Sequence, residues 1–257
     1  MRGRWSAVFA LPGLGPCVSS ARMELAPEID LEAANLALEA ASPEEILAWT
    51  WRTFRPHVIL TCSFQHDGVA LAHMLRDIAP EVPVVFVNTG FHFPETLAYR
   101  DEIRRRFGIR LVELDPILPR EEFAARHGLD LYARDPDQCC NINKVEPLKR
   151  FLPGVRAWIN GRRRDQAHTR QQIRVVEAFD GGLHKVNPMA RWTGRDTWQY
   201  LQRHGIPTHP LFEQGYASIG CAPCTRPVLP GENERDGRWA GQGRTECGLH
   251  TFLDPKA

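Results

Sequence analysis

The sequence lacks a long apolar run, an excess of charge of one sign and an internal repeat, and each absence excludes a class of protein. No apolar run is long enough to cross a bilayer, so no membrane association is expected. The 32 Lys and Arg residues are balanced by 31 Asp and Glu residues, which argues against general binding to nucleic acid or a membrane surface. Its 257 residues, 43% of them hydrophobic, suffice for one sizeable core.

The chain contains seven cysteines, an odd number, in a protein large enough to fold without disulfides. Cysteines in such a chain indicate a reducing compartment, where they serve metal binding or catalysis. We therefore expect a cytoplasmic protein.

Composition divides the chain into three parts. Residues 1–22 have a basic start and a short apolar stretch broken by Pro and Gly, and are expected to be a disordered extension or a start site assigned too early. Residues 23–229 are expected to form the main domain. Residues 230–257 are rich in glycine and charge, which indicates a flexible tail with a functional end.

Strand and helix patterns alternate along the main domain. Helical patterns cover 28–41, 42–54, 69–79, 93–108, 119–128 and 136–152, and strand patterns cover 57–63, 82–87, 109–114 and 155–160. This alternation predicts an α/β fold, a parallel sheet with helices on both faces. Ligands of such folds bind at the carboxyl ends of the strands, so the loops after Ser63, Asn88 and Gly161 should face one crevice.

Two pairs of cysteines indicate a metal centre. Cys139 and Cys140 are adjacent, and Cys221 and Cys224 form a C-x-x-C pair in a turn rich in Gly and Pro. Four thiolates suit a tetrahedral zinc ion or a cubane iron–sulfur cluster. Adjacent residues can supply two corners of the larger cluster, which favours iron–sulfur, with zinc as the alternative.

Four segments together resemble one family. "CCNINKVEPLKR" (139–150), "GRRRDQAHTR" (161–170), "QGYASIGCAPCTRP" (214–227) and "TECGLH" (245–250) are similar to the assimilatory sulfonucleotide reductases, and "VNTGFHFPETLAYRDEI" (87–103) agrees. The cysteine quartet narrows the resemblance to the bacterial adenosine 5′-phosphosulfate (APS) reductases that carry one [4Fe–4S] cluster per subunit. The resemblance runs from about Trp49 to His250. It implies an adenine nucleotide alpha hydrolase-like (Rossmann-like) fold and a role in assimilatory sulfate reduction and cysteine biosynthesis.

The resemblance implies a catalytic cysteine, Cys247, in the tail. Its thiolate would attack the sulfur of APS, AMP would leave, and an enzyme S-sulfocysteine would remain. A reduced thioredoxin or glutaredoxin-like protein would then attack Cys247 and release sulfite. An exposed thiol near cations suits a nucleophile, since cations lower its pKa and offset its repulsion from sulfate.

Further residues carry over from the family motifs. Lys144 would contact the sulfate and the cluster, and Arg235, Arg238 and His250 would contact the same anion. The loop "TCSFQHDG" (61–68) enters a predicted helix, whose backbone N–H groups suit a phosphate, and Ser63 and Asp67 are the expected contacts there; either is equally suited to cap the helix. In the basic loop after the fourth strand, Arg163 and Arg170 are the expected ligands for phosphate or sulfate.

Three alternatives remain open at this stage. A reductase of 3′-phosphoadenosine 5′-phosphosulfate (PAPS), or of both nucleotides, shares the chemistry. An ATP pyrophosphatase-type enzyme with a metal site is more distant, because "TCSFQHDG" lacks the paired glycines of the S-G-G-x-D-S loop. A zinc-stabilised binding protein without catalysis is the third.

Overall fold

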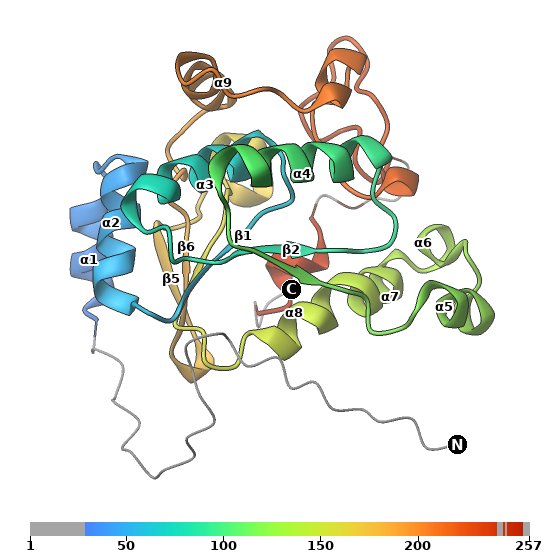
Figure 1. Ribbon diagram of the computed structural model, residues 1–257, viewed down its shortest axis with the longest axis horizontal. Coiled ribbons are helices and arrows are strands. Elements are labelled where there is room, and N and C mark those ends of the chain that lie inside the picture. The colour runs from blue at the N-terminus through green and yellow to red at the C-terminus, as the bar shows by residue number, and fades with distance from the viewer. Residues whose placement is uncertain (1–28, 241–243, 245, 254–257) are drawn as a thin grey trace.

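The computed structural model describes residues 29–240, 244 and 246–253, so the expectation for residues 1–22 lies outside the described residues. Its centre is a six-stranded sheet in the order β3-β2-β1-β4-β6-β5 (Figure 1). The strands are β1 Val58–Thr61, β2 Val84–Val87, β3 Leu111–Leu114, β4 Ala157–Ile159, β5 Val176–Phe179 and β6 Leu183–Val186. The four strands expected from the sequence are confirmed, and two more are present.

The sheet is mostly parallel, as predicted, with one exception at its edge. Strands β3, β2, β1, β4 and β6 run parallel, and β5 is antiparallel to β6. The two form a hairpin around Asp180–Gly182, where Gly181 and Gly182 have positive φ values that the tight turn requires. The sequence analysis missed this hairpin because its two short strands depend on pairing with each other and with β4.

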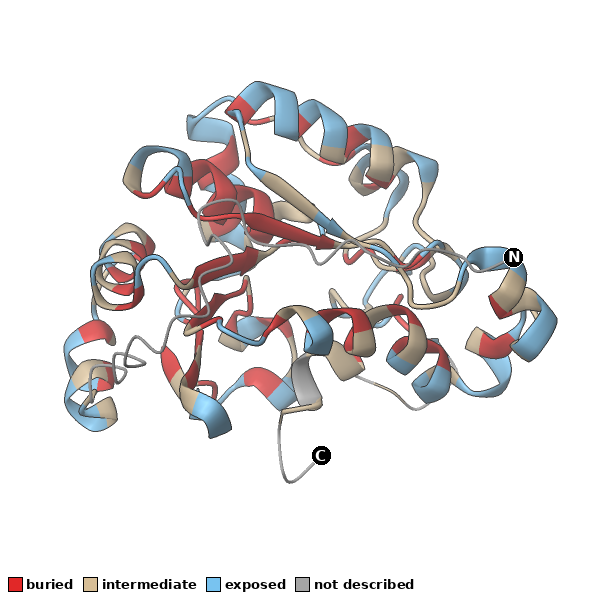
Figure 2. Cartoon of the chain, turned by 60° about the horizontal axis from the view of Figure 1, so that its bottom comes forward, coloured by how far each residue is buried: buried red, intermediate tan, exposed pale blue. Residues whose placement is uncertain are grey.

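The strands carry apolar side chains on both faces, which is why helices cover both. Leu60, Phe86 and Ile159 point to one core, and the neighbouring Ile59, Val85 and Trp158 point to the other. The buried strands run through the middle of the molecule in Figure 2. The first face is covered by α1 Leu31–Leu38, α2 Pro43–Phe54, α3 His66–Ile78, α4 Pro94–Phe107 and α9 Gly194–Arg203.

On the other face, α8 Glu146–Phe151 and α10 Gly248–Thr251 pack against the sheet. The helices α5 Arg120–His127, α6 Leu131–Arg134 and α7 Pro136–Cys140 pack around a separate small apolar cluster and lie beside the sheet in Figure 1. The expected helix at 136–152 is present but contains a π-helical segment, Asn141–Val145, between α7 and α8. Such bulges often occur at functional sites, because the extra residue per turn re-aims the side chains it carries.

The start of α2 illustrates how local sequence set the helix boundaries. Ser42 and Glu45 form the capping box that "SPEE" predicts: Ser42 Oγ accepts the Glu45 N–H and Glu45 Oε2 accepts the Ser42 N–H, at 3.2 and 2.7 Å. By contrast, α9 was not expected, although Thr193 and Asp196 cap it in the same way. No helix among the described residues is long and apolar enough to span a membrane.

Candidate active site

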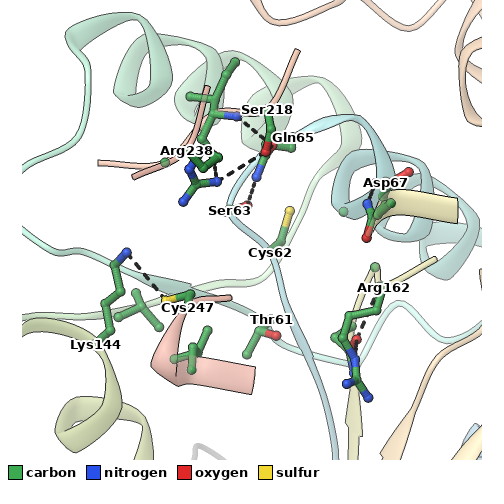
Figure 3. Close-up of a pocket in the computed structure, with 18 of the residues that line it drawn as sticks. Thr61, Cys62, Ser63, Gln65, Asp67, Lys144, Arg162, Ser218, Arg238 and Cys247 are labelled. Atoms are coloured by element: carbon green, nitrogen blue, oxygen red, sulfur yellow. Dashed lines mark hydrogen bonds between the residues drawn. The ribbon is translucent and has the colours of Figure 1, made fainter. Parts of the chain in front are cut away.

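A pocket lies at the carboxyl ends of β1, β2 and β4. Strand order reverses between β1 and β4, which is where α/β folds bind their ligands. The predicted loops after β1 and β4 both reach the pocket, and the loop after β2 contributes Thr89. The π-helical segment, residues 218–221 and the tail complete the wall. In Figure 3, Lys144 and Cys247 lie at one end of the pocket, and Asp67 and Arg162 at the other.

The loop between β1 and α3 is held in an unusual backbone conformation. Phe64 is fully buried with a φ of 57°, which is rare for a bulky residue, and its N–H lies 3.3 Å from Cys62 Sγ. Gln65 bridges two sides of the pocket: its Nε2 donates to Ser63 Oγ at 3.2 Å, and its Oε1 accepts the Ile219 N–H at 2.8 Å. The bridge fixes Ser63 at the pocket surface.

Asp67 and Arg163, both predicted substrate contacts, are engaged with each other. Asp67 lines the pocket, but its carboxylate also accepts bonds from Gln166 Nε2 at 2.7 Å and Thr197 Oγ1 at 2.8 Å. Arg163 does not line this pocket and also pairs with Asp165 and Glu234, at 2.9 and 2.7 Å. The two residues therefore support the pocket wall.

The remaining arginines of the basic loop have different carboxylate partners. Arg162 lines the pocket and pairs with Glu177, and Arg164 pairs with Glu39 away from it. Arg170 lines the pocket, and Glu246 of the tail holds its guanidinium. The density of positive charge expected from "GRRRDQAHTR" is thus largely neutralised within the fold.

Cys247 and Lys144 meet at the other end of the pocket. Lys144 Nζ lies 3.8 Å from Cys247 Sγ. While Cys140 is a free thiol, a hydrogen bond from it, together with the charge of Lys144, holds the pKa of Cys247 well below its ordinary value, although burial opposes this. Burial alone would lower the pKa of Lys144, but the nearby Cys221 and Cys247 sulfurs raise it.

The sequence analysis was wrong about the exposure of Cys247. The residue is buried, with 9% of its surface exposed. Leu249, Phe252 and Leu253 pack against the core on the α8 side of the sheet, and the Phe252 ring stacks on Trp158. This apolar spacing of three and four residues in "CGLHTFL" was the unused signal that the segment docks. His250 lies in α10, but its side chain is outside the described residues, so its role stays a prediction.

Two further residues lie beside Cys247: Arg238, which is positively charged, and Trp239, which packs against several arginines. Arg238 is buried; its Nη1 donates to Ser218 Oγ and to the Ile219 carbonyl, at 3.3 and 3.2 Å. Its Nε has no hydrogen-bond partner among the described residues. Trp239, which the sequence analysis missed, is buried with a φ of 49° and packs beneath three guanidinium groups, those of Arg235, Arg238 and Arg244. Of these cations, Arg235 and Arg238 line the pocket, whereas Arg244 pairs with Asp137.

The four predicted metal-binding cysteines share a second, smaller cavity. Cys139 and Cys140 at the end of α7, Cys221 and Cys224 in the facing turn, and Lys144 all line it. Asn143 Nδ2 lies 3.6 Å from Cys139 Sγ, and Thr89 Oγ1 lies 3.3 Å from Cys221 Sγ. All described cysteines are free thiols. Within the described part of the chain, no three His, Cys, Asp or Glu side chains converge closely enough to hold one metal ion.

Comparisons with known proteins agree on a family. Residues 57–227 match the phosphoadenosine phosphosulfate reductase domain. The chain is 45% identical to an adenosine 5′-phosphosulfate reductase of Streptomyces coelicolor, over 85% of this chain and 92% of the relative. It is 43% identical to a phosphoadenosine 5′-phosphosulfate reductase of Gloeobacter violaceus, over 82% and 90%.

A solved structure shows the same fold. The phosphoadenylyl-sulfate reductase from Candida auris, in a phosphate complex, superposes with a TM-score of 0.68 at 30% identity, covering 76% of this chain and 95% of that one. The α/β fold of the adenine nucleotide alpha hydrolase type expected from the sequence is thereby confirmed.

Proposed function

The chain belongs to the phosphoadenosine phosphosulfate reductase family, and on that premise we propose that it reduces adenosine 5′-phosphosulfate to sulfite and AMP. The observation that supports this most directly is the meeting of Cys247 with Lys144 in the pocket at the strand ends. A thiol beside a cation in this pocket suits nucleophilic attack on the sulfur of a phosphoric–sulfuric anhydride.

The proposed first step transfers the sulfo group. The Cys247 thiolate attacks the sulfur of the sulfate, a sulfur–sulfur bond forms, and the bond from that sulfur to the bridging oxygen breaks. The electron pair stays on the oxygen, which becomes a phosphate oxygen of AMP. The product on the enzyme is S-sulfocysteine.

The cations near Cys247 have a clear part in this step. An anionic thiolate must approach an anionic sulfate, and fixed positive charge offsets the repulsion and the charge that develops in the transition state. We assign this part to Lys144, Arg235 and Arg238, with His250 as a further contact. Arg238 Nε, which is buried and has no hydrogen-bond partner within the described ranges, supports the assignment, because such a donor in a pocket suits an acceptor of the substrate.

Ser63 is our proposed contact at the phosphate, since its hydroxyl lines the pocket at the entry to α3. Arg170 is retained as a residue of the anion site, where it lines the pocket with Arg235. Asp67 and Arg163 are proposed to act on the substrate only through the loop conformation that their ion pair maintains.

We propose that Cys139, Cys140, Cys221 and Cys224 hold a [4Fe–4S] cluster. They line one cavity without converging on a single point, which suits a cluster with separated irons better than one zinc ion. The donors at Cys139 and Cys221 suit sulfur ligands, which commonly accept such hydrogen bonds. When bound, the group would supply fixed charge beside Lys144 and help to position the substrate.

The second step is proposed to need a reduced thioredoxin or glutaredoxin-like protein. A thiolate of this partner attacks Cys247 Sγ, sulfite leaves with the electron pair of the sulfur–sulfur bond, and the partner's second thiol releases Cys247 as the partner becomes a disulfide. Cys247 is too buried for a protein thiol to reach, so we propose that the segment carrying it moves away between the steps. Such thiol chemistry requires a reducing compartment, for which we propose the cytoplasm.

A second candidate is reduction of PAPS, alone or alongside APS. The relative of Gloeobacter violaceus carries that name at nearly the same identity. The same pocket would then accept an additional 3′-phosphate.

The test is the mass of the intact protein after anaerobic mixing with APS, and separately with PAPS, without reductant. We expect a gain of one SO₃ on the Cys247 peptide, faster with APS, and no gain in Cys247→Ser. A faster gain with PAPS would replace the substrate assignment. No gain with either nucleotide, on protein that contains iron and sulfide, would refute the proposed chemistry.

A further inference from the structure

Glu246, the residue before the nucleophile, has its carboxylate inside the protein. Its Oε1 and Oε2 accept two bonds from one guanidinium, that of Arg170, from Nε at 2.6 Å and Nη2 at 2.7 Å. Thr169 Oγ1 donates to Oε1 at 3.0 Å, and Arg235 Nη2 lies 3.5 Å from Oε2. Only 13% of the Glu246 side chain is exposed. Neither the fold nor the reaction described above has yet given this carboxylate a role.

The two arginines that Glu246 joins come from different parts of the chain. Arg170 follows β4, and Arg235 belongs to the tail. Both line the active-site pocket, and Glu246 does not. The carboxylate therefore contacts them from outside the pocket lining. Two buried guanidinium groups repel each other in a medium of low polarity, and a shared carboxylate offsets that repulsion.

The contacts of Glu246 also constrain its neighbour. A bidentate arginine–carboxylate pair fixes both the position and the orientation of the side chain. Because Glu246 and Cys247 are adjacent, fixing one side chain leaves little freedom for the backbone that carries the other. Arg170 is itself held by Gln166, which also bonds Asp67 in the pocket wall. The nucleophile is thus tied to the nucleotide pocket through a continuous set of polar contacts.

We propose that Glu246 is a positioning residue that seats Cys247 against Lys144 and, in the same contact, offsets the repulsion between Arg170 and Arg235. The proposal rests on the proposed function. When the tail leaves for the reductant, Arg170 loses the carboxylate of Glu246, and redocking or a bound anion restores the neutralising charge.

For Glu246→Gln, the proposal predicts that the rate of sulfo transfer falls while the affinity for the nucleotide does not. The substitution keeps the shape and removes one negative charge near the anion site, so binding of the anionic nucleotide should not weaken. Sulfo transfer should slow, because the nucleophile is no longer held in place. A variant that had lost a substrate-binding cation would bind the nucleotide more weakly as well as react more slowly. A variant that had lost its structure would be impaired in every measured property.

The experiment compares Glu246→Gln with Glu232→Gln in the cluster-containing protein. Glu232 is the matched control: it lies in the tail, it forms a two-bond pair with one arginine, Arg226, and it is outside the pocket lining. Three quantities are measured: the single-turnover rate of SO₃ addition to Cys247, the Kd for APS, and the iodoacetamide labelling rate of the Cys247 peptide without nucleotide.

For Glu246→Gln we expect sulfo transfer about 100-fold slower, the loss typical of a misplaced reactive group. The Kd for APS should stay the same or fall, and Cys247 labelling should rise several-fold. Glu232→Gln should match the unmodified protein in all three. A wild-type transfer rate, or a Kd that rises in proportion to the loss of rate, would overturn the proposal.

Two outcomes need a further measurement: failure of Glu246→Gln to fold, and failure of the unmodified protein to react. If Glu246→Gln fails to fold, Arg170→Lys is measured in its place; it keeps the charge but loses the two-bond geometry, and faster labelling is again expected, with unchanged labelling contradicting the proposal. If the unmodified protein adds no SO₃ at all, the proposed function fails. The labelling comparison still decides whether Glu246 seats Cys247.

Discussion

Lys144 Nζ lies 3.8 Å from Cys247 Sγ, although 103 residues separate them in the chain. Lys144 reaches this position from the π-helical segment after α7, and Cys247 reaches it because α10 docks on the core. Lys144 also lines the cavity of the four cysteines. One ammonium group therefore adjoins both Cys247, the proposed nucleophile, and the proposed cluster site.

Lys144→Met should impair sulfo transfer far more than folding. The substitution keeps the bulk of the side chain and removes the positive charge, so the rate of SO₃ addition should fall by about 100-fold or more. Stability should change little, since burying an isolated charge is itself costly. Rapid-quench mass analysis and urea unfolding measure the two effects. Arg150→Met, which removes an exposed cation of α8, is the control, and a transfer rate equal to the control's would remove Lys144 from the mechanism.

Cys140→Ser should lose the visible absorbance, iron and sulfide of an iron–sulfur protein. Removing one of four ligands leaves an incomplete thiolate set for the cluster. Cys62→Ser is the matched control, because Cys62 is equally buried but does not line the cavity of the four cysteines. Metal analysis after anaerobic purification gives the answer. Zinc without iron in the unmodified protein would favour the zinc alternative instead.

Gly220→Ala should displace Arg238 from the pocket. A Cβ atom at residue 220 would overlap the Arg238 guanidinium, which is buried and pinned to the Ser218–Ile219 segment. We expect sulfo transfer to slow by about 10-fold to 100-fold. A double-mutant cycle with Arg238→Gln tests the cause. The two effects should be far from additive if they act through the same guanidinium, and full additivity would contradict this explanation.

Stability should fall between pH 7.5 and pH 5 partly through His209. Burial lowers the pKa of His209 to about 4, and its Nδ1 lies 3.2 Å from the Leu211 backbone N–H, which a protonated nitrogen could not accept. In the unfolded chain the pKa of histidine is about 6.5. Between these values the unfolded state binds more protons, so acidification favours unfolding, by about 2 kcal/mol at pH 5.

Urea unfolding at the two pH values measures this contribution. His209→Gln should be less stable than the unmodified protein at pH 7.5 but should lose less stability on acidification. The same substitution at exposed His168 should leave the loss unchanged. An equal loss in His209→Gln and in the unmodified protein would exclude His209 as the cause.

Local signals identified much of the fold. The run "HVILTCS" became β1 because short β-branched apolar runs suit a buried strand, and Ser42 and Glu45 set the start of α2 by hydrogen bonds within four residues. The hairpin of β5 and β6 was missed, since its strands depend on pairing with each other and with β4.

The sequence predicted which residues belong to the candidate site but not which of them form ion pairs with one another. The sequence motifs identified Lys144, Arg238 and five cysteines as candidate site residues. No local pattern shows that Asp67 engages Arg163 across 96 residues, or that Glu246 holds Arg170 across 76. Which residues form such ion pairs depends on which helices, strands and loops the strand order of the sheet places next to one another.

The sequence by itself determined the alternation of strands and helices and the two cysteine pairs, because periodicity and motif spacing are local properties. Its resemblance to a family singled out Cys247 as the proposed nucleophile. Only the tertiary structure decided that Cys247 is buried and which arginines keep charge available for a substrate. Burial depends on docking of the whole tail segment, and the charge left at each arginine depends on carboxylates distant in the chain.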